Sequence, residues 1–136
     1  MAGVTLDSNI YVSAFEFGGI CARLMGMARA GDFRLDLSDP IIDEVLTVLR
    51  EDFHWNGYRV HDAWQRMLSL GKKVTPSESL QVILEDPDHD CVLECAVTAS
   101  SDYIITNDKD LLRLKEYAGI RIVTPAQFLE REKRPS

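Results

Sequence analysis

Residues 103–112 read YIITNDKDLL, an apolar run followed by two acidic residues and a second apolar pair. The apolar run 103–106 is typical of a short buried strand. Asp108 comes shortly after this run and is a favoured residue type at the start of a helix. Residues 4–6 (VTL), followed by Asp7, repeat the arrangement near the start of the chain. If the two strands are neighbours in a parallel sheet, both acidic residues lie at the same edge of that sheet.

The rest of the chain alternates between short strands and helices. Residues 33–37 (FRLDL) alternate in polarity with period two, which predicts a half-buried strand. Asp39 is expected to cap a helix that Pro40 opens, and residues 88–99 are apolar nearly all round, which predicts a buried helix. The predicted strands are residues 4–6, 33–37, 103–106 and 120–123, with a short extended piece at Val74, and the predicted helices are residues 10–15, 20–30, 40–49, 58–70, 88–99, 108–114 and 125–129. This alternation predicts one three-layer α/β/α domain with a central parallel sheet.

The composition is that of an ordinary globular domain. The chain has 136 residues, of which 46% are hydrophobic and 27% are charged, and this argues against disorder and coiled coils. The domain is expected to span residues 1–131, followed by a charged tail at residues 132–136. No apolar run approaches the roughly 20 residues of a membrane span, and no secretory signal is visible.

The three cysteines, Cys21, Cys91 and Cys95, are an odd number, which favours reduced thiols in the cytoplasm. Cys91 and Cys95 lie four residues apart beside His89, so a zinc site is conceivable. No second pair of Cys or His ligands exists at suitable spacing, and the neighbours of both thiols are apolar. Buried packing is therefore the favoured interpretation.

Four carboxylates are predicted to meet in one crevice. Ligands of parallel sheets bind beyond the carboxyl ends of the strands, where the strand order reverses. Asp7 and Asp108 follow two strands, Glu44 lies in the helix after the second strand, and Asp90 lies in the first turn of the buried helix. Such a cluster of like charges favours a hard divalent cation, Mg²⁺ or Mn²⁺, which would polarise a phosphodiester and lower the pKa of a bound water. Each acid taken singly is also explained by helix capping or by solvation.

At these residues the chain resembles the PIN domain family, a group of metal-dependent ribonucleases. The matching segments are VTLDSNIYVSA (4–14), SDPIIDEV (38–45), DPDHDCVLECA (86–96) and SDYIITNDKDLL (101–112). Asn107 stands where the family usually has Gly, and Asn tolerates left-handed backbone geometry, so the turn is expected to survive. Residues 120–129 are similar to the bacterial and archaeal VapC-like branch, the toxins of toxin–antitoxin pairs.

The resemblance implies a fold, a chemistry and a set of residues. It implies an endoribonuclease that hydrolyses RNA phosphodiesters with bound Mg²⁺ or Mn²⁺, together with an antitoxin partner and a homodimer. The implied catalytic and metal-binding residues are Asp7, Glu44, Asp90 and Asp108, with Asn9 and Thr106 in support. Asp110 is a possible fifth acid, for which a charge at a helix N-terminus is the alternative. Asp86 and Asp88 are rivals of Asp90.

The chain carries 15 Lys and Arg residues against 22 Asp and Glu residues, a net charge of −7. This balance argues against a protein that holds nucleic acid by its overall charge. If several acids surround a metal ion, the ion offsets part of their charge, which predicts weak, metal-dependent affinity for RNA. Candidate RNA contacts are Arg23, Lys72, Lys73, Lys109 and Arg113 for phosphates and Trp55 and Tyr58 for bases, with solvation and packing as the alternatives.

Two other function classes stay open. The first is a non-catalytic RNA- or protein-binding dimerisation module with the same fold, against which the complete acid set argues. The second is a phosphatase of the haloacid-dehalogenase type, which also begins with a strand and an Asp. That chemistry needs a second Asp two residues later, where this chain has Asn9.

Overall fold

The computed structural model describes residues 1–76 and 87–132, apart from the side chains of residues 87–90 and 132. One sheet contains the strands β1 (Gly3–Leu6), β2 (Arg34–Leu37), β3 (Gly71–Lys73), β4 (Tyr103–Ile105), β5 (Glu116–Tyr117) and β6 (Ile120–Val123). The helices are α1 (Ser8–Glu16), α2 (Gly19–Ala30), α3 (Asp39–Glu51), α4 (Gly57–Leu70), α5 (Pro87–Ala99), α6 (Lys109–Leu114) and α7 (Pro125–Glu132). None of the helices in these ranges has the length and apolarity that a membrane span requires.

The strand order is β3-β2-β1-β4-β6-β5, and every pairing is parallel except that of β5 with β6. The chain moves outward from β1 to β2 and β3, and then returns to the other side of β1 to form β4 and β6. The strand order therefore reverses between β1 and β4, where Leu6 lies opposite Ile105. This reversal places the predicted binding crevice at the carboxyl ends of β1 and β4.

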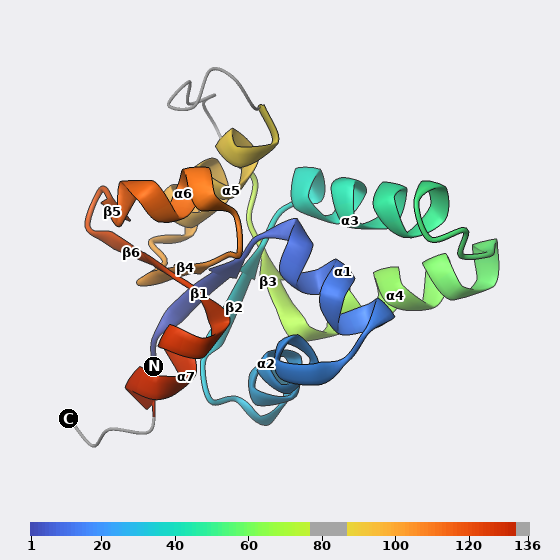
Figure 1. Ribbon diagram of the computed structural model, residues 1–136, viewed down its shortest axis with the longest axis horizontal. Coiled ribbons are helices and arrows are strands. Elements are labelled where there is room, and N and C mark those ends of the chain that lie inside the picture. Colours follow the sequence, from blue (N-terminus) through green and yellow to red (C-terminus); the bar gives the residue numbers. More distant parts are fainter. Residues whose placement is uncertain (77–86, 133–136) are drawn as a thin grey trace.

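Helices cover both faces of the sheet, as predicted (Figure 1). Helix α5 packs on β1, β2 and β4, and α6 packs beside β6. On the other side α1 packs against α2 and α3, and α2 packs against α7. Right-handed crossovers explain this division, because connections that run in opposite directions along a sheet cross on opposite faces. The predicted three-layer α/β domain is confirmed.

Local capping sets the starts and ends of the helices. The Asp7 carboxylate accepts a hydrogen bond from the Ser8 backbone N–H at 2.7 Å and so starts α1. Gly31, with φ 82°, ends α2 in the left-handed conformation expected of a C-terminal glycine. At α3 the cap is Ser38, so the prediction of Asp39 as the cap is wrong by one residue. Asp39 instead occupies the first helical position, where its charge is favourable.

Strand β2 differs most from its prediction. The alternating pattern predicts one solvated face, but Asp36 is fully buried and Arg34 is half-buried. The reason is that α5 covers the polar face of this strand, which also lies between two other strands. The polar side chains on that face are therefore paired inside the protein.

Three further predictions change in detail. Helix α5 is not buried all round, because Val97 and Thr98 face solvent. Asn107 does not adopt positive φ, so its tolerance of left-handed geometry is not used. The extended residue Val74 lies just beyond β3, where its N–H donates to the Leu37 carbonyl at 2.7 Å. The sequence also has a short apolar run at residues 80–84, which lies outside the described residues, as do four of the five residues of the predicted tail.

Strand β5 is absent from the sequence prediction. It spans two residues and forms a tight hairpin with β6 through Ala118 and Gly119, whose φ angles are 52° and 81°. Two successive positive φ angles are typical of the two-residue hairpin turn that matches the twist of a sheet. A strand of two residues is too short to show alternation in polarity, and Ala118 is an uncommon residue for this turn.

Candidate active site at the carboxyl edge of the sheet

The geometry of the site follows from the pairing of β1 with β4. Asp7 is the residue after β1, and its backbone N–H donates to the Ile105 carbonyl at 3.0 Å. The Thr106 N–H in turn donates to the Val123 carbonyl of β6 at 3.0 Å. Hydrogen bonds of the sheet type therefore continue past the ends of the strands. They fix the backbone at the point where the acidic side chains begin.

Asp7 is held in one orientation by several hydrogen bonds. Its side chain is 4% exposed. One carboxylate oxygen accepts from the Ser8 N–H at 2.7 Å, and the other accepts from the Thr106 hydroxyl at 2.6 Å and from the Asn9 amide at 3.2 Å. The two short bonds come from a helix N-terminus and a neighbouring strand end, so two separate elements fix the carboxylate.

Thr106 connects Asp7 to Asp108. It is fully buried, and its hydroxyl donates to Asp7 while accepting the Asp108 backbone N–H at 2.9 Å. Asp108 caps α6 and accepts the Asp110 N–H at 2.8 Å. The structure thus brings Asp7, Asn9, Thr106 and Asp108 together at the switch point of the sheet. Their role as metal ligands or supporting groups stays a prediction.

The other predicted acids of the described residues lie on helices α3, α5 and α6. Glu44 is half-buried in α3, the helix that follows β2. Asp110 is exposed, and its carboxylate lies 3.4 Å from the Arg113 guanidinium on the same helix, as a helix N-terminal charge would. Asp90 and Asp88 belong to the first turn of α5, but their side chains lie outside the described residues, as does all of Asp86.

The donor set tests whether a metal ion would fit. Among the described side chains, no three Asp, Glu, His or Cys residues are grouped closely enough to hold a metal ion. Mg²⁺, however, is often bound through one or two carboxylates with water completing its octahedron. Asp7 and Asp108 supply such carboxylates, and the buried Asn9 Oδ1 has no hydrogen-bond partner in the described structure. This hard oxygen set fits Mg²⁺ or Mn²⁺ and does not fit zinc, which prefers nitrogen and sulfur.

Sequence reasoning missed a second set of polar residues beneath this edge. Asp36 is fully buried and forms an ion pair with Arg34, whose Nε lies 2.6 Å from its Oδ1. Hydrogen bonding to Asp36 raises the pKa of Arg34. Asp102, the residue before β4, accepts the Gly3 N–H at 2.8 Å. The sequence does contain a signal for this ion pair, because Arg34 and Asp36 carry opposite charges and lie two residues apart in one predicted strand. The alternating pattern alone, however, predicts that this polar face is solvated.

A groove of about 480 Å³ lies elsewhere, between α1 and α4. Trp55 forms part of its wall and is 9% exposed, because its ring packs on Phe15 and under the Arg59 guanidinium. Its indole N–H donates to Glu16 at 2.6 Å. Trp55 is therefore a packing residue, as the alternative interpretation held, while Tyr58 at the same groove is 91% exposed.

Comparison with known proteins identifies the family of the chain. Residues 3–110 match the PIN domain family. The chain belongs to the PIN domain family. No curated protein matches it in sequence. Among solved structures it is similar to a chain in the crystal structure of VapBC2 from Rickettsia felis bound to a DNA fragment from their promoter, with a TM-score of 0.64, 15% identity, and coverage of 88% of this chain and 96% of that chain.

The family match runs from β1 through the first residues of α6 and so includes both Asp7 and Asp108. At 15% identity the similarity to the Rickettsia felis chain concerns the fold alone. The family resemblance that the sequence motifs indicated is confirmed.

Proposed function

We propose that this PIN domain protein is a Mg²⁺- or Mn²⁺-dependent endoribonuclease that hydrolyses RNA phosphodiester bonds. The observation that carries the proposal is the placement of Asp7 and Asp108 at the switch point, joined through the Thr106 hydroxyl. Asp7, Glu44, Asp90 and Asp108 are the proposed metal-binding acids. When bound, the metal ion supplies the Lewis acid that polarises the phosphodiester and activates water.

The chain's own residues would prepare the site for that ion. Short bonds from the Ser8 N–H and the Thr106 hydroxyl orient the Asp7 carboxylate before any ligand arrives. The longer bonds, from the Asn9 amide at 3.2 Å and the Ser8 hydroxyl at 3.4 Å, are the ones that a ligand would displace. A turned Asn9 amide would then present an oxygen toward a water molecule in the site.

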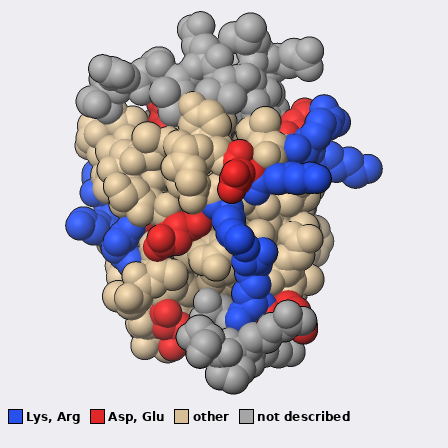
Figure 2. All heavy atoms as spheres, turned by 90° about the vertical axis from the view of Figure 1, so that its left-hand side faces the viewer, with Lys and Arg blue, Asp and Glu red and all other residues tan. Residues whose placement is uncertain are grey.

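Surface charge supports local rather than general binding of RNA. Figure 2 shows Lys and Arg side chains interspersed with acidic side chains on one face of the molecule, rather than gathered in one broad basic patch. Lys73 is paired with Asp39 at 3.3 Å, and Arg113 is paired with Asp110. With a net charge of −7, RNA affinity would depend on the metal ion and on a few cations near it.

The test is cleavage of RNA by purified protein in Mn²⁺ and in excess EDTA. Wild type is expected to cleave only with the metal, and Asp7→Asn and Asp108→Asn are expected to abolish cleavage while the fold persists. Asp32→Asn is the control, because this exposed acid lies before β2, at the opposite edge of the sheet. Cleavage that persists in EDTA or in the Asp7→Asn, Asp108→Asn double variant would overturn the proposal. Wild type that neither cleaves RNA nor binds Mn²⁺ would instead favour the non-catalytic binding module.

We further propose an antitoxin-type protein partner, a homodimer, and a cytoplasmic location in which the three free cysteines stay reduced. The VapBC2 complex, to which the fold is similar, supports the first of these. Apolar side chains near the groove between α1 and α4, Phe17 and Tyr58 among them, are exposed and offer a surface for such a partner. Co-purification with the product of an adjacent gene, lost in Tyr58→Glu, would test it.

A further inference from the structure

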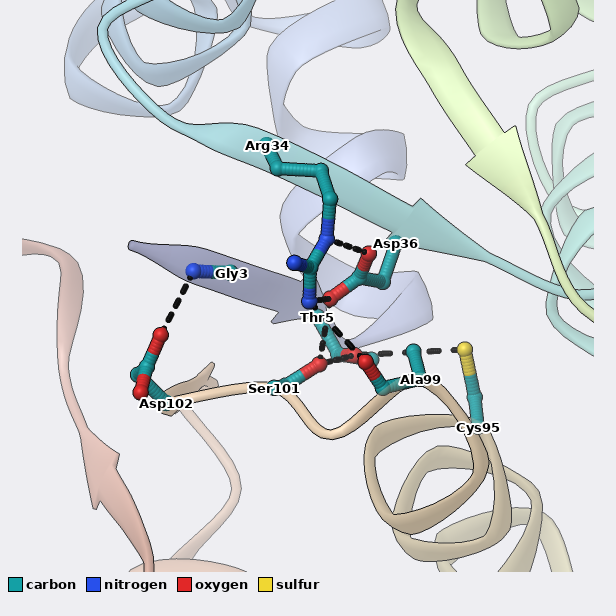
Figure 3. Close-up of polar contacts among 8 residues, drawn as sticks. All are labelled: Gly3, Thr5, Arg34, Asp36, Cys95, Ala99, Ser101 and Asp102. Carbon is teal, nitrogen blue, oxygen red and sulfur yellow. Dashed lines mark hydrogen bonds and ion pairs between the residues drawn. The ribbon is translucent and has the colours of Figure 1, made fainter. Parts of the chain in front are cut away.

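A buried polar cluster joins the elements that lead to the proposed active site (Figure 3). We define the Asp36 cluster as Thr5, Arg34, Asp36, Cys95 and Ser101. It lies between the sheet and α5, where β1 and β2 contribute three of its members and α5 and the loop after it contribute the other two. Asp36, Thr5 and Cys95 are fully buried. Apolar side chains make up most of the core around them.

Hydrogen bonds make the cluster continuous. The Ser101 hydroxyl donates to Asp36 Oδ2 at 2.6 Å, because an ionised carboxylate can only accept. Ser101 therefore accepts from the Thr5 hydroxyl at 2.8 Å, and Thr5 also lies 3.9 Å from Cys95 Sγ. One chain of contacts thus runs from β2 through the start of β4 to β1 and α5.

Arg34 ties the same carboxylate to the end of α5. Its guanidinium makes a two-pronged contact with Asp36, at 2.6 and 3.0 Å, and donates to the Ala99 carbonyl at 2.9 Å. A cation at the last carbonyls of a helix is electrostatically favourable. Gly3 permits this arrangement, since a Cβ at that position would lie 2.1 Å from Arg34 Nη2.

Two members of the cluster stand close in sequence to residues of the proposed site. Thr5 precedes Asp7 by two residues, and Ser101 precedes Thr106 by five. Helix α5, held at its far end by Arg34, carries Asp90 in its first turn. A displacement of α5 along the sheet would therefore move its acidic end relative to Asp7.

The ion pair is a weak source of stability compared with an apolar core of the same volume, because the Asp36 carboxylate loses its water and the half-buried Arg34 loses part of it. Its directional bonds, however, allow only one register between the elements that they join. We propose that the Asp36 cluster positions β1, β4 and α5 relative to one another, so that the acids of the metal site meet. Its residues are positioning residues, and the inference rests on the proposed function.

The test measures Mn²⁺ affinity by calorimetry and stability by urea unfolding on the same variants. Ser101→Ala and Thr5→Val remove hydroxyls of the cluster, and both are expected to weaken Mn²⁺ binding about tenfold. Thr5→Ser keeps the hydroxyl and is expected to restore affinity to near the wild-type value. Asn56→Ala removes the cap of α4, which carries none of the acids, and is expected to lower the urea midpoint without changing Mn²⁺ affinity.

The outcomes separate the two proposals. If wild type binds Mn²⁺ and the cluster variants bind it equally well, as Asn56→Ala does, the cluster only stabilises the fold and the inference is overturned. If wild type binds no Mn²⁺, the proposed function fails and takes this inference with it. Weaker binding in Thr5→Val that Thr5→Ser restores supports the positioning role.

Discussion

At the scale of single residues, Thr106 connects the two acids Asp7 and Asp108 of the proposed site. Its side chain contacts both ends of the proposed site, donating to Asp7 and accepting from the Asp108 backbone. Because Thr106 is fully buried, water cannot replace either hydrogen-bond partner if one is lost. Its hydroxyl is therefore expected to set the spacing of the two acids.

Thr106→Val keeps the shape of the side chain but removes the hydroxyl. We expect this variant to bind Mn²⁺ about 10- to 100-fold more weakly, the usual effect of losing a partner of a metal ligand. The matched control is Thr124→Val, which removes the cap that accepts the Gln127 N–H at the start of α7. That control should lose about 1 kcal/mol of stability and keep its Mn²⁺ affinity. Equal affinities in the two variants would show that Thr106 is only a packing residue.

The thiol of Cys95 gives a second prediction at this scale. Burial raises its pKa to about 11, and only the thiolate reacts with disulfide reagents. We expect the reagent DTNB at pH 8 to modify the partly exposed Cys91 in the folded protein, while the buried Cys21 and Cys95 react only after unfolding. Rapid labelling of the Cys95 peptide in folded protein, found by mass spectrometry, would contradict this.

The same shift makes stability depend on alkaline pH. The folded protein holds the Cys95 proton more tightly than the unfolded chain, whose thiol has a pKa of about 8.5. The stability from this group is therefore fully present below that pH, and it is lost as the pH rises toward 11. Tyr11, whose pKa is raised by burial and then by Cys95 and Asp36, acts in the same direction at higher pH.

At the scale of elements, the contact between β1 and β2 depends on one missing side chain. Gly3 leaves room for the Arg34 guanidinium, which Asp36 and the Ala99 carbonyl hold in place. Gly3→Ala must displace that guanidinium and so loosen the hold on α5. We expect a loss of about 1–3 kcal/mol in the free energy of unfolding, as for other overpacked sites.

A double-mutant cycle separates this mechanism from a general intolerance of Ala. In the Arg34→Gln background the shorter side chain no longer crosses Gly3, so Gly3→Ala is expected to be much less destabilising there. Urea unfolding of the four proteins should give a coupling energy of at least about 1 kcal/mol. Additive losses would mean that Arg34 is not the residue with which the new methyl group collides.

The strands show which features of the fold can be predicted from the sequence and which cannot. Strands 4–6 and 120–123 were predicted with bounds within one residue of those of β1 and β6, because apolar runs between turn signals are strong signals. The burial of Asp36 could not be predicted, because alternation in polarity is the same for a solvated face and for a face whose polar groups are paired beneath a helix. That distinction depends on α5, which is distant in sequence.

At the scale of the whole molecule, the order of the strands explains the site. Asp7 and Asp108 are about a hundred residues apart in sequence, yet the reversal of strand order between β1 and β4 brings them together. The strand–acid–helix pattern was sufficient to predict this edge. The sequence pattern does not give the direction of the Asp110 side chain, which pairs with Arg113, because that depends on local rotamers at an exposed helix start.

Net charge has a different meaning once the fold is known. The balance of −7 describes the whole chain, whereas Asp7 and Asp108 are concentrated at one edge of the sheet. A metal ion bound there would offset their charge where a phosphodiester must approach. The acidic composition therefore agrees with an RNA substrate only if the site holds a metal ion.

Calorimetric titration of Mn²⁺ into metal-free protein tests that claim most directly. Wild type and the control Asp32→Asn are expected to bind Mn²⁺ with the same affinity. Asp7→Asn is expected to bind it at least about tenfold more weakly, although it stays folded because Asn caps a helix nearly as well as Asp. Absence of binding to wild type at millimolar Mn²⁺, or equal binding to Asp7→Asn, would contradict the account.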